Sequence, residues 1–202
     1  KRVILIWSSR KGMFYLSLVA AFIGSILFTP LVKKLAFRVG AVDKPNYRKV
    51  HAKIMPRLGG LAIFLAFLVG VVILRPTNEA MIPILIGAFI VIITGVLDDM
   101  LEISAKAKFL GQTVAAAIVI FFGDIQIDFI NLPFGGILDF GYLSIPLTLI
   151  WIVGITNAIN LIDGLDGLAA GVSTIALVTL AAMAFIMGNT FVLVMALVLA
   201  VS

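Results

Sequence analysis

The sequence contains no cysteine and a single histidine among its 202 residues. Without cysteine, the chain can form neither a disulfide framework nor a thiolate metal site. Charged residues are also scarce, at 12%, whereas 62% of the residues are hydrophobic and the mean hydropathy is +1.23. Soluble globular domains contain roughly 45–50% apolar residues. The composition therefore excludes an ordinary soluble domain and indicates an all-α integral membrane protein.

Apolar stretches of roughly helix-spanning length recur along the whole chain. Because several are shorter than the ~20 residues of a full span, we expect neighbouring polar loops to contribute helix ends. The pattern predicts a polytopic helix bundle with six spans and a partial seventh that begins near residue 190. The six predicted spans are residues 13–35, 59–74, 80–97, 107–122, 143–160 and 168–187.

Two segments outside these spans have distinct predictions. The first twelve residues, KRVILIWSSRKG, are too short to span and lack a signal-peptide cleavage site. We expect residues 1–12 to be an upstream or non-native extension and residues 13–202 to form one membrane domain that starts at Met13. The segment DIQIDFINLPFGGILDFG alternates polar and apolar residues around a Pro-Gly turn. It predicts a short external β-hairpin on the membrane surface.

Positively charged residues gather in the loops on one side of the predicted bundle. The net charge is +5, and span counting places residues 36–58, 98–106 and 161–167 on the same side. By the positive-inside rule this side is cytoplasmic. The cations lie beside spans, so anionic headgroups of the bilayer are the nearer partner, and we expect no nucleic-acid partner. Residues 33–58 contain Lys33, Lys34, Arg38, Lys44, Arg48, Lys49, Lys53 and Arg57.

The first loop, GAVDKPNYRKVHAKIMPRLGG, combines cations with residues that disfavour helix. Pro45 and Pro56 interrupt helical structure, and the pair Gly59-Gly60 lets a backbone approach closely. A loop of this kind suits a polyphosphate. Contact with lipid headgroups is the alternative, and the residues of the loop leave both interpretations open.

The second loop, GVLDDMLEISAKAKFLGQ, begins with two adjacent carboxylates at the end of an apolar span. Asp98 and Asp99 repel each other, so a cation between them and a substrate is expected. Mg²⁺ fits this role because it takes one or two carboxylates and leaves room for phosphate oxygens. The alternative is that the acidic pair only marks the water boundary of the span.

The third stretch, NAINLIDGLDGLAAG, places polar residues at every third position of an apolar segment. If the helix continues, they line one stripe, and Gly164 and Gly167 permit a break. An Asp near the membrane centre costs about 2.5–3.5 kcal/mol, which favours a polar site. Hydrogen bonding between helices is the alternative. The four residues are Asn157, Asn160, Asp163 and Asp166.

In this order, DKPNYRKVHAKIMPRLGG, LDDMLEISAKAKF and NAINLIDGLDGLAAG resemble the cytoplasmic motifs of the polyprenyl-phosphate N-acetylhexosamine-1-phosphate transferases. The forms PRLGG and RKVH resemble most the branch that transfers GlcNAc-1-phosphate to undecaprenyl phosphate, which initiates teichoic acid or other envelope glycans. The resemblance runs from about Met13 to Ser202. It implies UDP-GlcNAc and undecaprenyl phosphate as substrates, Mg²⁺ or alternatively Mn²⁺ as cofactor, a homodimer, and a bacterial cytoplasmic membrane location.

The resemblance also implies roles for individual residues. It makes Asp98, Asp99 and Asp163 catalytic and assigns the metal to Asp98 and Asp99. It implies substrate contacts from Asp43, Lys44, Asn46, Arg48, His51, Arg57, Gly59, Gly60, Lys106, Lys108, Asn157, Asn160 and Asp166.

Two further interpretations compete with a complete transferase. Family members continue with more spans, another aspartate motif and a histidine-rich loop, so we expect this chain to be an N-terminal part and consider an inactive fragment. Intramembrane aspartates also occur in ion- or proton-coupled transporters. A transporter would place its acids near mid-membrane in paired repeats, whereas here they cluster at one rim and no repeat is visible.

Overall fold

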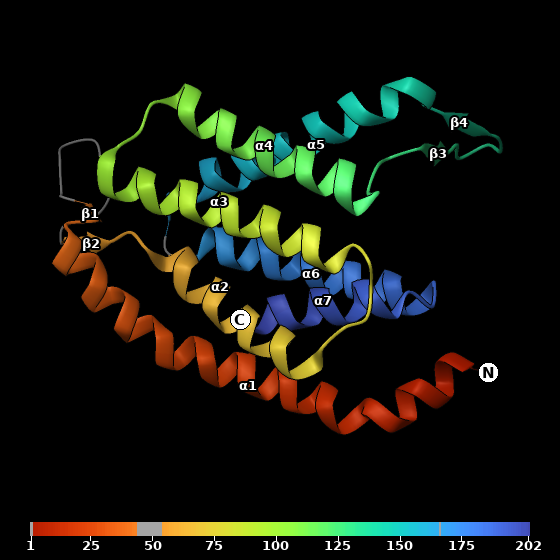
Figure 1. The fold of residues 1–202 in the computed structure, drawn as a ribbon, viewed down its shortest axis with the longest axis horizontal. Helices are drawn as coiled ribbons and strands as arrows, with labels where there is room; N and C mark the ends of the chain where they lie inside the picture. The colour runs from red at the N-terminus through yellow and green to blue at the C-terminus, as the bar shows by residue number, and fades with distance from the viewer. Residues whose placement is uncertain (1, 44–53, 166) are drawn as a thin grey trace. The chain divides into compact units, whose positions relative to one another are not determined.

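The computed structural model describes residues 2–43, 54–165 and 167–202, and the side chains from residue 11 onward within those ranges. Seven α-helices and two small antiparallel sheets make up these parts of the chain (Figure 1). The helices are α1 (Arg2–Val39), α2 (Gly59–Leu74), α3 (Met81–Leu101), α4 (Ala105–Gly123), α5 (Ser144–Ile162), α6 (Leu168–Ile186) and α7 (Thr190–Val201).

The prediction of an all-α polytopic membrane protein is confirmed. Among the described residues, five segments are long and apolar enough to cross a membrane: Lys11–Val39, Met81–Leu101, Ala105–Gly123, Gly141–Ile162 and Leu168–Ile186. The predicted spans over residues 59–74 and from 190 onward correspond to the shorter apolar helices α2 and α7. The first candidate span, Lys11–Val39, begins close to the predicted residue 13, and α1 itself extends further back, to Arg2.

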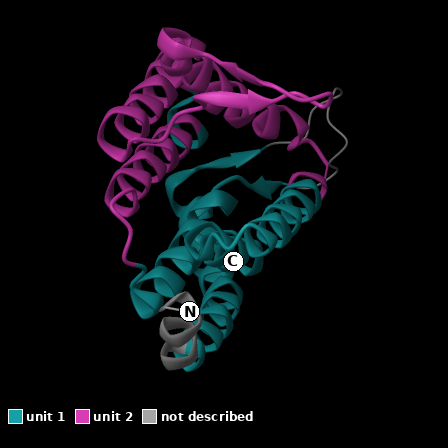
Figure 2. Ribbon diagram, turned by 90° about the vertical axis from the view of Figure 1, so that its right-hand side faces the viewer, with its two compact units in different colours: residues 1–76, 99–102, 170–202 teal, residues 77–98, 103–169 magenta. Residues whose placement is uncertain are grey.

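The chain divides into two compact units (Figure 2). Unit 1 contains residues 1–76, 99–102 and 170–202, and unit 2 contains residues 77–98 and 103–169. Along the chain, the division between the two units falls between Asp98 and Asp99. Each unit has its own packing.

Unit 1 is built on close contacts between α1, α2 and α7. An added Cβ at Gly70 of α2 would lie 2.5 Å from Val198 Cγ1, 3.2 Å from Ala21 Cβ and 3.3 Å from the Ser17 carbonyl oxygen. One turn away, Gly24 meets Ala66 at about van der Waals distance. Small residues let membrane helices approach closely enough for backbone contact. The absence of a side chain at Gly70 thus decides how three helices meet.

Unit 2 is an antiparallel series of α3, α4 and α5. Gly111 of α4 packs on Thr94 of α3, and Gly87 lies against Val119 further along the same pair. The next pair is antiparallel as well, because Asn157 of α5 contacts Gln112 while Thr148 contacts Ile127, which follows α4. The end of α3, the start of α4 and the end of α5 therefore meet at one end of the unit.

Both small sheets are two-stranded and antiparallel. The predicted hairpin is confirmed: β3 (Phe129–Asn131) pairs with β4 (Ile137–Asp139), with Ile130 opposite Leu138. Its place on the external face stays a prediction. The other sheet, β1 (Val42–Asp43) with β2 (Met55–Pro56), was not predicted. Two-residue strands are too short to leave an alternating pattern in the sequence.

Candidate functional site

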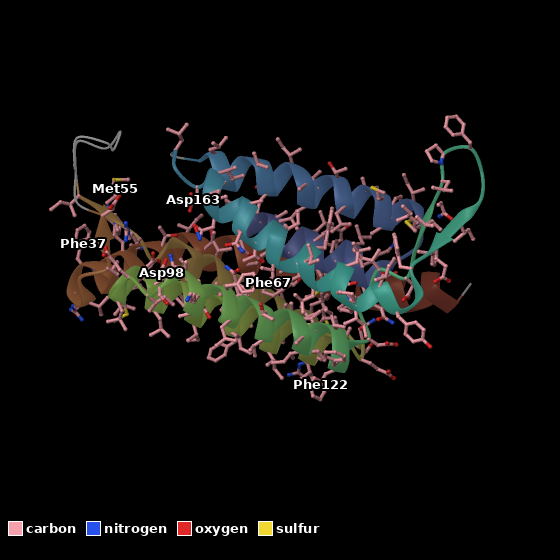
Figure 3. The ribbon with its side chains drawn as sticks, turned by 90° about the horizontal axis from the view of Figure 1, so that it is seen from above. Phe37, Met55, Phe67, Asp98, Phe122 and Asp163 are labelled. Atoms are coloured by element: carbon pink, nitrogen blue, oxygen red, sulfur yellow. The ribbon has the colours of Figure 1, made fainter. Side chains whose placement is uncertain are left out.

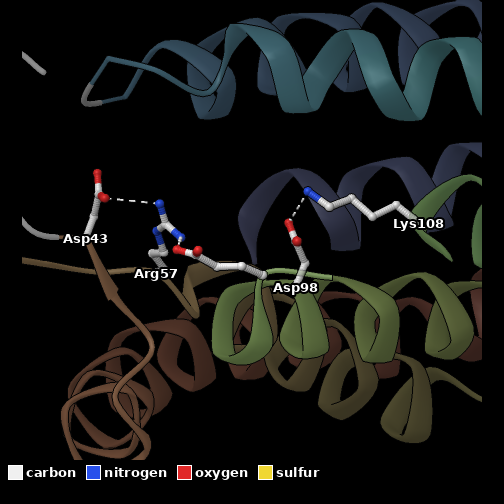
Figure 4. A network of polar contacts seen from close by, with 5 residues as sticks. Asp43, Arg57, Asp98 and Lys108 are labelled. Atoms are coloured by element: carbon white, nitrogen blue, oxygen red, sulfur yellow. Dashed lines mark hydrogen bonds and ion pairs between the residues drawn. The ribbon is translucent and has the colours of Figure 1, made fainter. Parts of the chain in front are cut away.

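An ion pair closes the base of the first loop, in unit 1. Arg57 Nη2 donates to Asp43 Oδ1 at 3.0 Å, and the Arg57 amide donates to the Ala41 carbonyl at 3.0 Å (Figure 4). The pairing of β1 with β2 puts these residues side by side. Two candidate substrate residues, Asp43 and Arg57, are therefore first of all partners of each other.

Arg57 also reaches the end of α3. Its Nη1 lies 3.9 Å from Glu102 Oε1, and Glu102 follows α3 in the left-handed conformation, with φ 50°. Glu102 belongs to unit 1 by its contacts, like Arg57. The first and second motifs, which are more than 40 positions apart, are thus brought together, as the counting of spans predicts.

Asp98 and Lys108 form a second ion pair, within unit 2. Lys108 Nζ lies 2.5 Å from Asp98 Oδ2, with the two side chains 34% and 23% exposed (Figure 4). Asp98 is in the last turn of α3 and Lys108 in the first turn of α4. Ser104 caps α4 by accepting from the Ala107 amide at 3.3 Å, which fixes where the helix that carries Lys108 begins.

The acidic pair lies inside α3 rather than after its end. Consecutive residues of an α-helix point about 100° apart, so Asp98 and Asp99 do not face the same way. Asp99 is half-buried, and Lys106, the other basic candidate, is exposed. Lys108 is the partner of Asp98.

The third motif does not continue as one helix. α5 ends at Ile162, Asp163 is its C-cap residue, and Gly167 has φ 79°. The predicted break at the glycines is therefore present, and the single helical stripe ends with Asn160. Asn160 and Asp163 are exposed. Asp163 lies at the end of unit 2 that holds Asp98, opposite Phe122 (Figure 3).

Asn157 makes the interhelical hydrogen bond that was the alternative interpretation for one asparagine. Its Nδ2 donates to Gln112 Oε1 at 2.6 Å and to the Val153 carbonyl at 2.8 Å. Both amide hydrogens are used, and the Val153 carbonyl, which can only accept, fixes the amide orientation. The carboxamide oxygen of Asn157 is then left as an acceptor.

Gln112 is the residue that the motif reasoning missed. It lies in α4 and is only 7% exposed. The available signal was a lone amide inside an apolar span, since a polar group at membrane depth needs a partner. A single amide without a motif around it did not indicate which helix would supply that partner.

Several predicted residues lie outside the described parts of the chain: Lys44, Asn46, Arg48, His51 and Asp166. Gly59 and Gly60 form the exposed first turn of α2. An added Cβ at Gly59 would meet nothing within 4 Å. Close approach of a substrate to this pair stays a prediction.

Comparison with known proteins adds a family to this geometry. The sequence model of glycosyl transferase family 4 matches residues 81–202, which is more than half of the chain and includes the second and third motifs. The chain belongs to this family. The matched region holds the Asp98–Lys108 pair and the Gln112–Asn157 pair of unit 2, and Glu102 of unit 1.

Curated relatives support the same family. The chain is 49% identical over 191 residues to a probable undecaprenyl-phosphate N-acetylglucosaminyl 1-phosphate transferase of Bacillus subtilis, which covers 92% of this chain and 53% of the relative. It is 38% identical to a decaprenyl-phosphate N-acetylglucosaminephosphotransferase of Mycobacterium tuberculosis, over 71% of this chain and 38% of the relative. It is 29% identical to an undecaprenyl-phosphate alpha-N-acetylglucosaminyl 1-phosphate transferase of Salmonella typhi, over 86% and 47%. The chain spans about half the length of the curated relatives it matches.

Proposed function

We propose that the chain forms part of an enzyme that transfers GlcNAc-1-phosphate from UDP-GlcNAc to undecaprenyl phosphate and releases UMP. The observation that carries the proposal is the family match over residues 81–202, which contains Asp98, Lys108 and Asn157 at one end of unit 2. The names of the relatives supply the acceptor and the sugar. No described feature favours a transporter, since Asp98 and Asp163 lie at helix ends.

The proposed reaction is a direct displacement. A phosphate oxygen of undecaprenyl phosphate attacks the sugar-bearing phosphorus of UDP-GlcNAc, the bond from that phosphorus to the bridging oxygen breaks, and UMP leaves with the electron pair. A phosphate monoester carries about −1.5 to −2 charge at neutral pH, so the acceptor needs no strong base. Lys108, held by Asp98, is placed to neutralise phosphate charge, and Asp98 keeps its ammonium oriented. Isolation of a phosphorylated Asp98 or Asp99 would contradict direct attack.

We propose Mg²⁺, or alternatively Mn²⁺, as the cofactor of this reaction. No group of three or more His, Asp or Glu side chains that could hold a metal occurs in the described part of the chain. Mg²⁺ commonly takes one or two protein carboxylates and fills its other positions with water and substrate phosphate. Because Asp98 and Asp99 point in different directions on α3, one of the two carboxylates would hold the ion. A bound Mg²⁺ supplies charge neutralisation on the diphosphate. The chain's own residues then orient and bind the substrate.

We place the proposed site on the cytoplasmic face of the bacterial inner membrane, in a homodimer. The basic loops at residues 36–58 and 98–108 support the cytoplasmic side through the positive-inside rule. Cytoplasmic UDP-GlcNAc and a membrane-anchored acceptor can meet only at that face. Cysteine labelling from each side of inverted membrane vesicles, at exposed Lys106→Cys, tests the orientation directly.

The deciding experiment measures UMP release from UDP-GlcNAc in vesicles that contain undecaprenyl phosphate. We expect release that depends on Mg²⁺ and on the lipid acceptor. Because the relatives are about twice as long, the assay is run on this chain and on the whole product of its gene. Activity only in the longer protein supports the fragment alternative. Absence of release from both would reject the proposed function.

A further inference from the structure

The β3–β4 hairpin connects two membrane-spanning segments. It leaves the end of Ala105–Gly123 and leads into Gly141–Ile162. Phe122, next to the hairpin, lies at the opposite end of unit 2 from Asp98 (Figure 3). The hairpin therefore stands where the bilayer ends, on the face away from the proposed site.

The base of the hairpin is fixed to α5 by hydroxyl groups. The Ile127 amide donates to Thr148 Oγ1 at 2.8 Å, and the Ser144 hydroxyl is shared between the Ile127 carbonyl at 2.9 Å and Asp128 Oδ1 at 3.1 Å. Ser144 and Thr148 are both buried. The hairpin is thus held in one orientation on its helix.

Several polar groups at the base and the turn of the hairpin are paired within the protein. Asp139 Oδ1 accepts from the Gly141 amide at 2.8 Å, and the Phe140 amide donates to the Asp128 carbonyl at 2.8 Å. At the turn, the Leu132 amide donates to the Gly136 carbonyl at 3.1 Å. Backbone groups that are already hydrogen-bonded cost little when they are removed from water, and the exposed carboxylates of Asp128 and Asp139 stay on the side of the water.

The apolar side chains of the hairpin point outward instead. Phe134 at the tip is 101% exposed, as in an extended chain, and Tyr142 is 100% exposed. This surface continues into Phe121 and Phe122, which are exposed at the end of α4. The other exposed apolar residues are Phe129, Ile130, Leu132, Ile137, Leu138 and Leu143.

The lack of basic residues near the hairpin indicates which kind of partner its apolar surface can contact. The sequence from residue 109 to residue 202 contains no Lys, Arg or His, so the hairpin offers no cation to a lipid phosphate or an acidic partner. Aromatic side chains concentrate at the boundary between headgroups and acyl chains. An isolated two-stranded hairpin is also marginal in water.

We propose that the β3–β4 hairpin inserts its apolar side chains, with Phe134 foremost, into the interfacial region of the bilayer. The insertion rests on aromatic and aliphatic burial and not on attraction to anionic headgroups. It is independent of the proposed enzymatic function. It anchors the end of unit 2 that lies away from Asp98.

The test places a fluorescent tryptophan at the hairpin tip. Trp7 and Trp151, the two tryptophans of the sequence, are replaced by phenylalanine, and Phe134→Trp or, as a second probe, Tyr142→Trp is added. Both sites are fully exposed, so neither change removes an internal contact. In phosphatidylcholine vesicles we expect emission at short wavelength, strong quenching by lipids brominated near the headgroup, and protection from aqueous iodide.

The matched control is Glu79→Trp, in the exposed loop between α2 and α3. Its emission should be quenched by iodide and not by brominated lipid. Iodide quenching at Phe134→Trp and Tyr142→Trp would show that the hairpin lies in water. Insensitivity to both quenchers would show that protein, such as a second copy, covers it. Either result overturns the proposal, and so does quenching by brominated lipid that is lost when salt is raised.

Discussion

The helices inside unit 1 and those inside unit 2 are held together by different kinds of contact. In unit 1 the closest contacts are between small residues: Gly70 meets Val198 and Ala21, and Gly24 meets Ala66. In unit 2 the helices also share polar side chains, in the pairs Gln112–Asn157 and Asp98–Lys108. Close packing of two helices needs a small residue at the point of contact, whereas a polar contact inside a membrane protein needs two matching side chains, one on each helix.

The difference between the two units indicates that unit 2 holds the functional groups. Polar groups are expensive among apolar helices, so their concentration at one end of unit 2 calls for a role beyond packing. In unit 1 the polar contacts described join Asp43, Arg57 and Glu102, which lie at the ends of elements rather than between helices. Four substitutions test the comparison.

The largest expected effect is on catalysis, at Asp98. Asp98→Asn removes the charge that orients Lys108, and we expect UMP release to fall about 10²–10³-fold, as for the loss of one preorganised electrostatic contact. Asp124→Asn is the control, because Asp124 caps α4 in the left-handed conformation that asparagine also adopts. Full activity of Asp98→Asn would remove Asp98 from the site.

Gly70→Ala tests the packing of unit 1. The added Cβ would collide with Val198, so we expect a loss of unfolding free energy of about 1–3 kcal/mol, the usual cost of overpacking. Gly171→Ala in α6 is matched to it, since a Cβ there meets nothing within 4 Å. Thermal unfolding in detergent gives both values. Equal stability of the two variants would show that α1, α2 and α7 are not tightly packed at Gly70.

Gln112→Leu tests the polar contact of unit 2. It leaves one amide hydrogen of Asn157 without its acceptor, and hydrogen bonds between membrane helices contribute about 0.6 kcal/mol on average and up to about 1.7 kcal/mol. The exposed Gln126→Leu is the control. In a double-mutant cycle with Asn157→Leu, the two losses should be less than additive. Strict additivity would mean that the side chains do not interact.

The smallest expected effect is at Arg57. Its ion pairs with Asp43 and Glu102 are partly exposed, so Arg57→Gln should lower the unfolding free energy by only about 0–1 kcal/mol. The loss should shrink at high salt because exposed charges are screened. Arg38→Gln, in the last turn of α1, is a matched change of charge. A large, salt-independent loss would show that Arg57 is more than a surface tie.

The helices and the β3–β4 hairpin were predictable because their signals are local. Apolar stretches long enough to span gave the predictions for α3 to α6 within a few residues, and the Pro-Gly turn gave β3 and β4. The β1–β2 pair has two residues in each strand and no local pattern. The first helix extends to Arg2, beyond the apolar stretch that predicted the span, and the sequence before Met13 did not indicate this.

The candidate site was only half predictable. Repeated polar residues in an apolar segment indicated Asn157 and Asp163, and span counting indicated that the first two loops share a side, which the contact between Arg57 and Glu102 bears out. Which residues pair could not be read from spacing. Asp98 pairs with Lys108 and not with Lys106 because α4 begins at Ala105, which turns the two lysines in different directions.

The sequence by itself determined that this is a helical membrane protein, where its helices run, and which segments carry polar groups. Composition and periodicity depend only on residues that are close together in the sequence, so they can be read without knowing how the helices pack. Tertiary structure alone decided that Gln112 is the partner of Asn157, that Arg57 joins Asp43 to Glu102, and that Gly70 is the point of closest approach in unit 1. Each of these depends on the rotation of one helix against another, which side-chain packing sets and no short stretch of sequence contains.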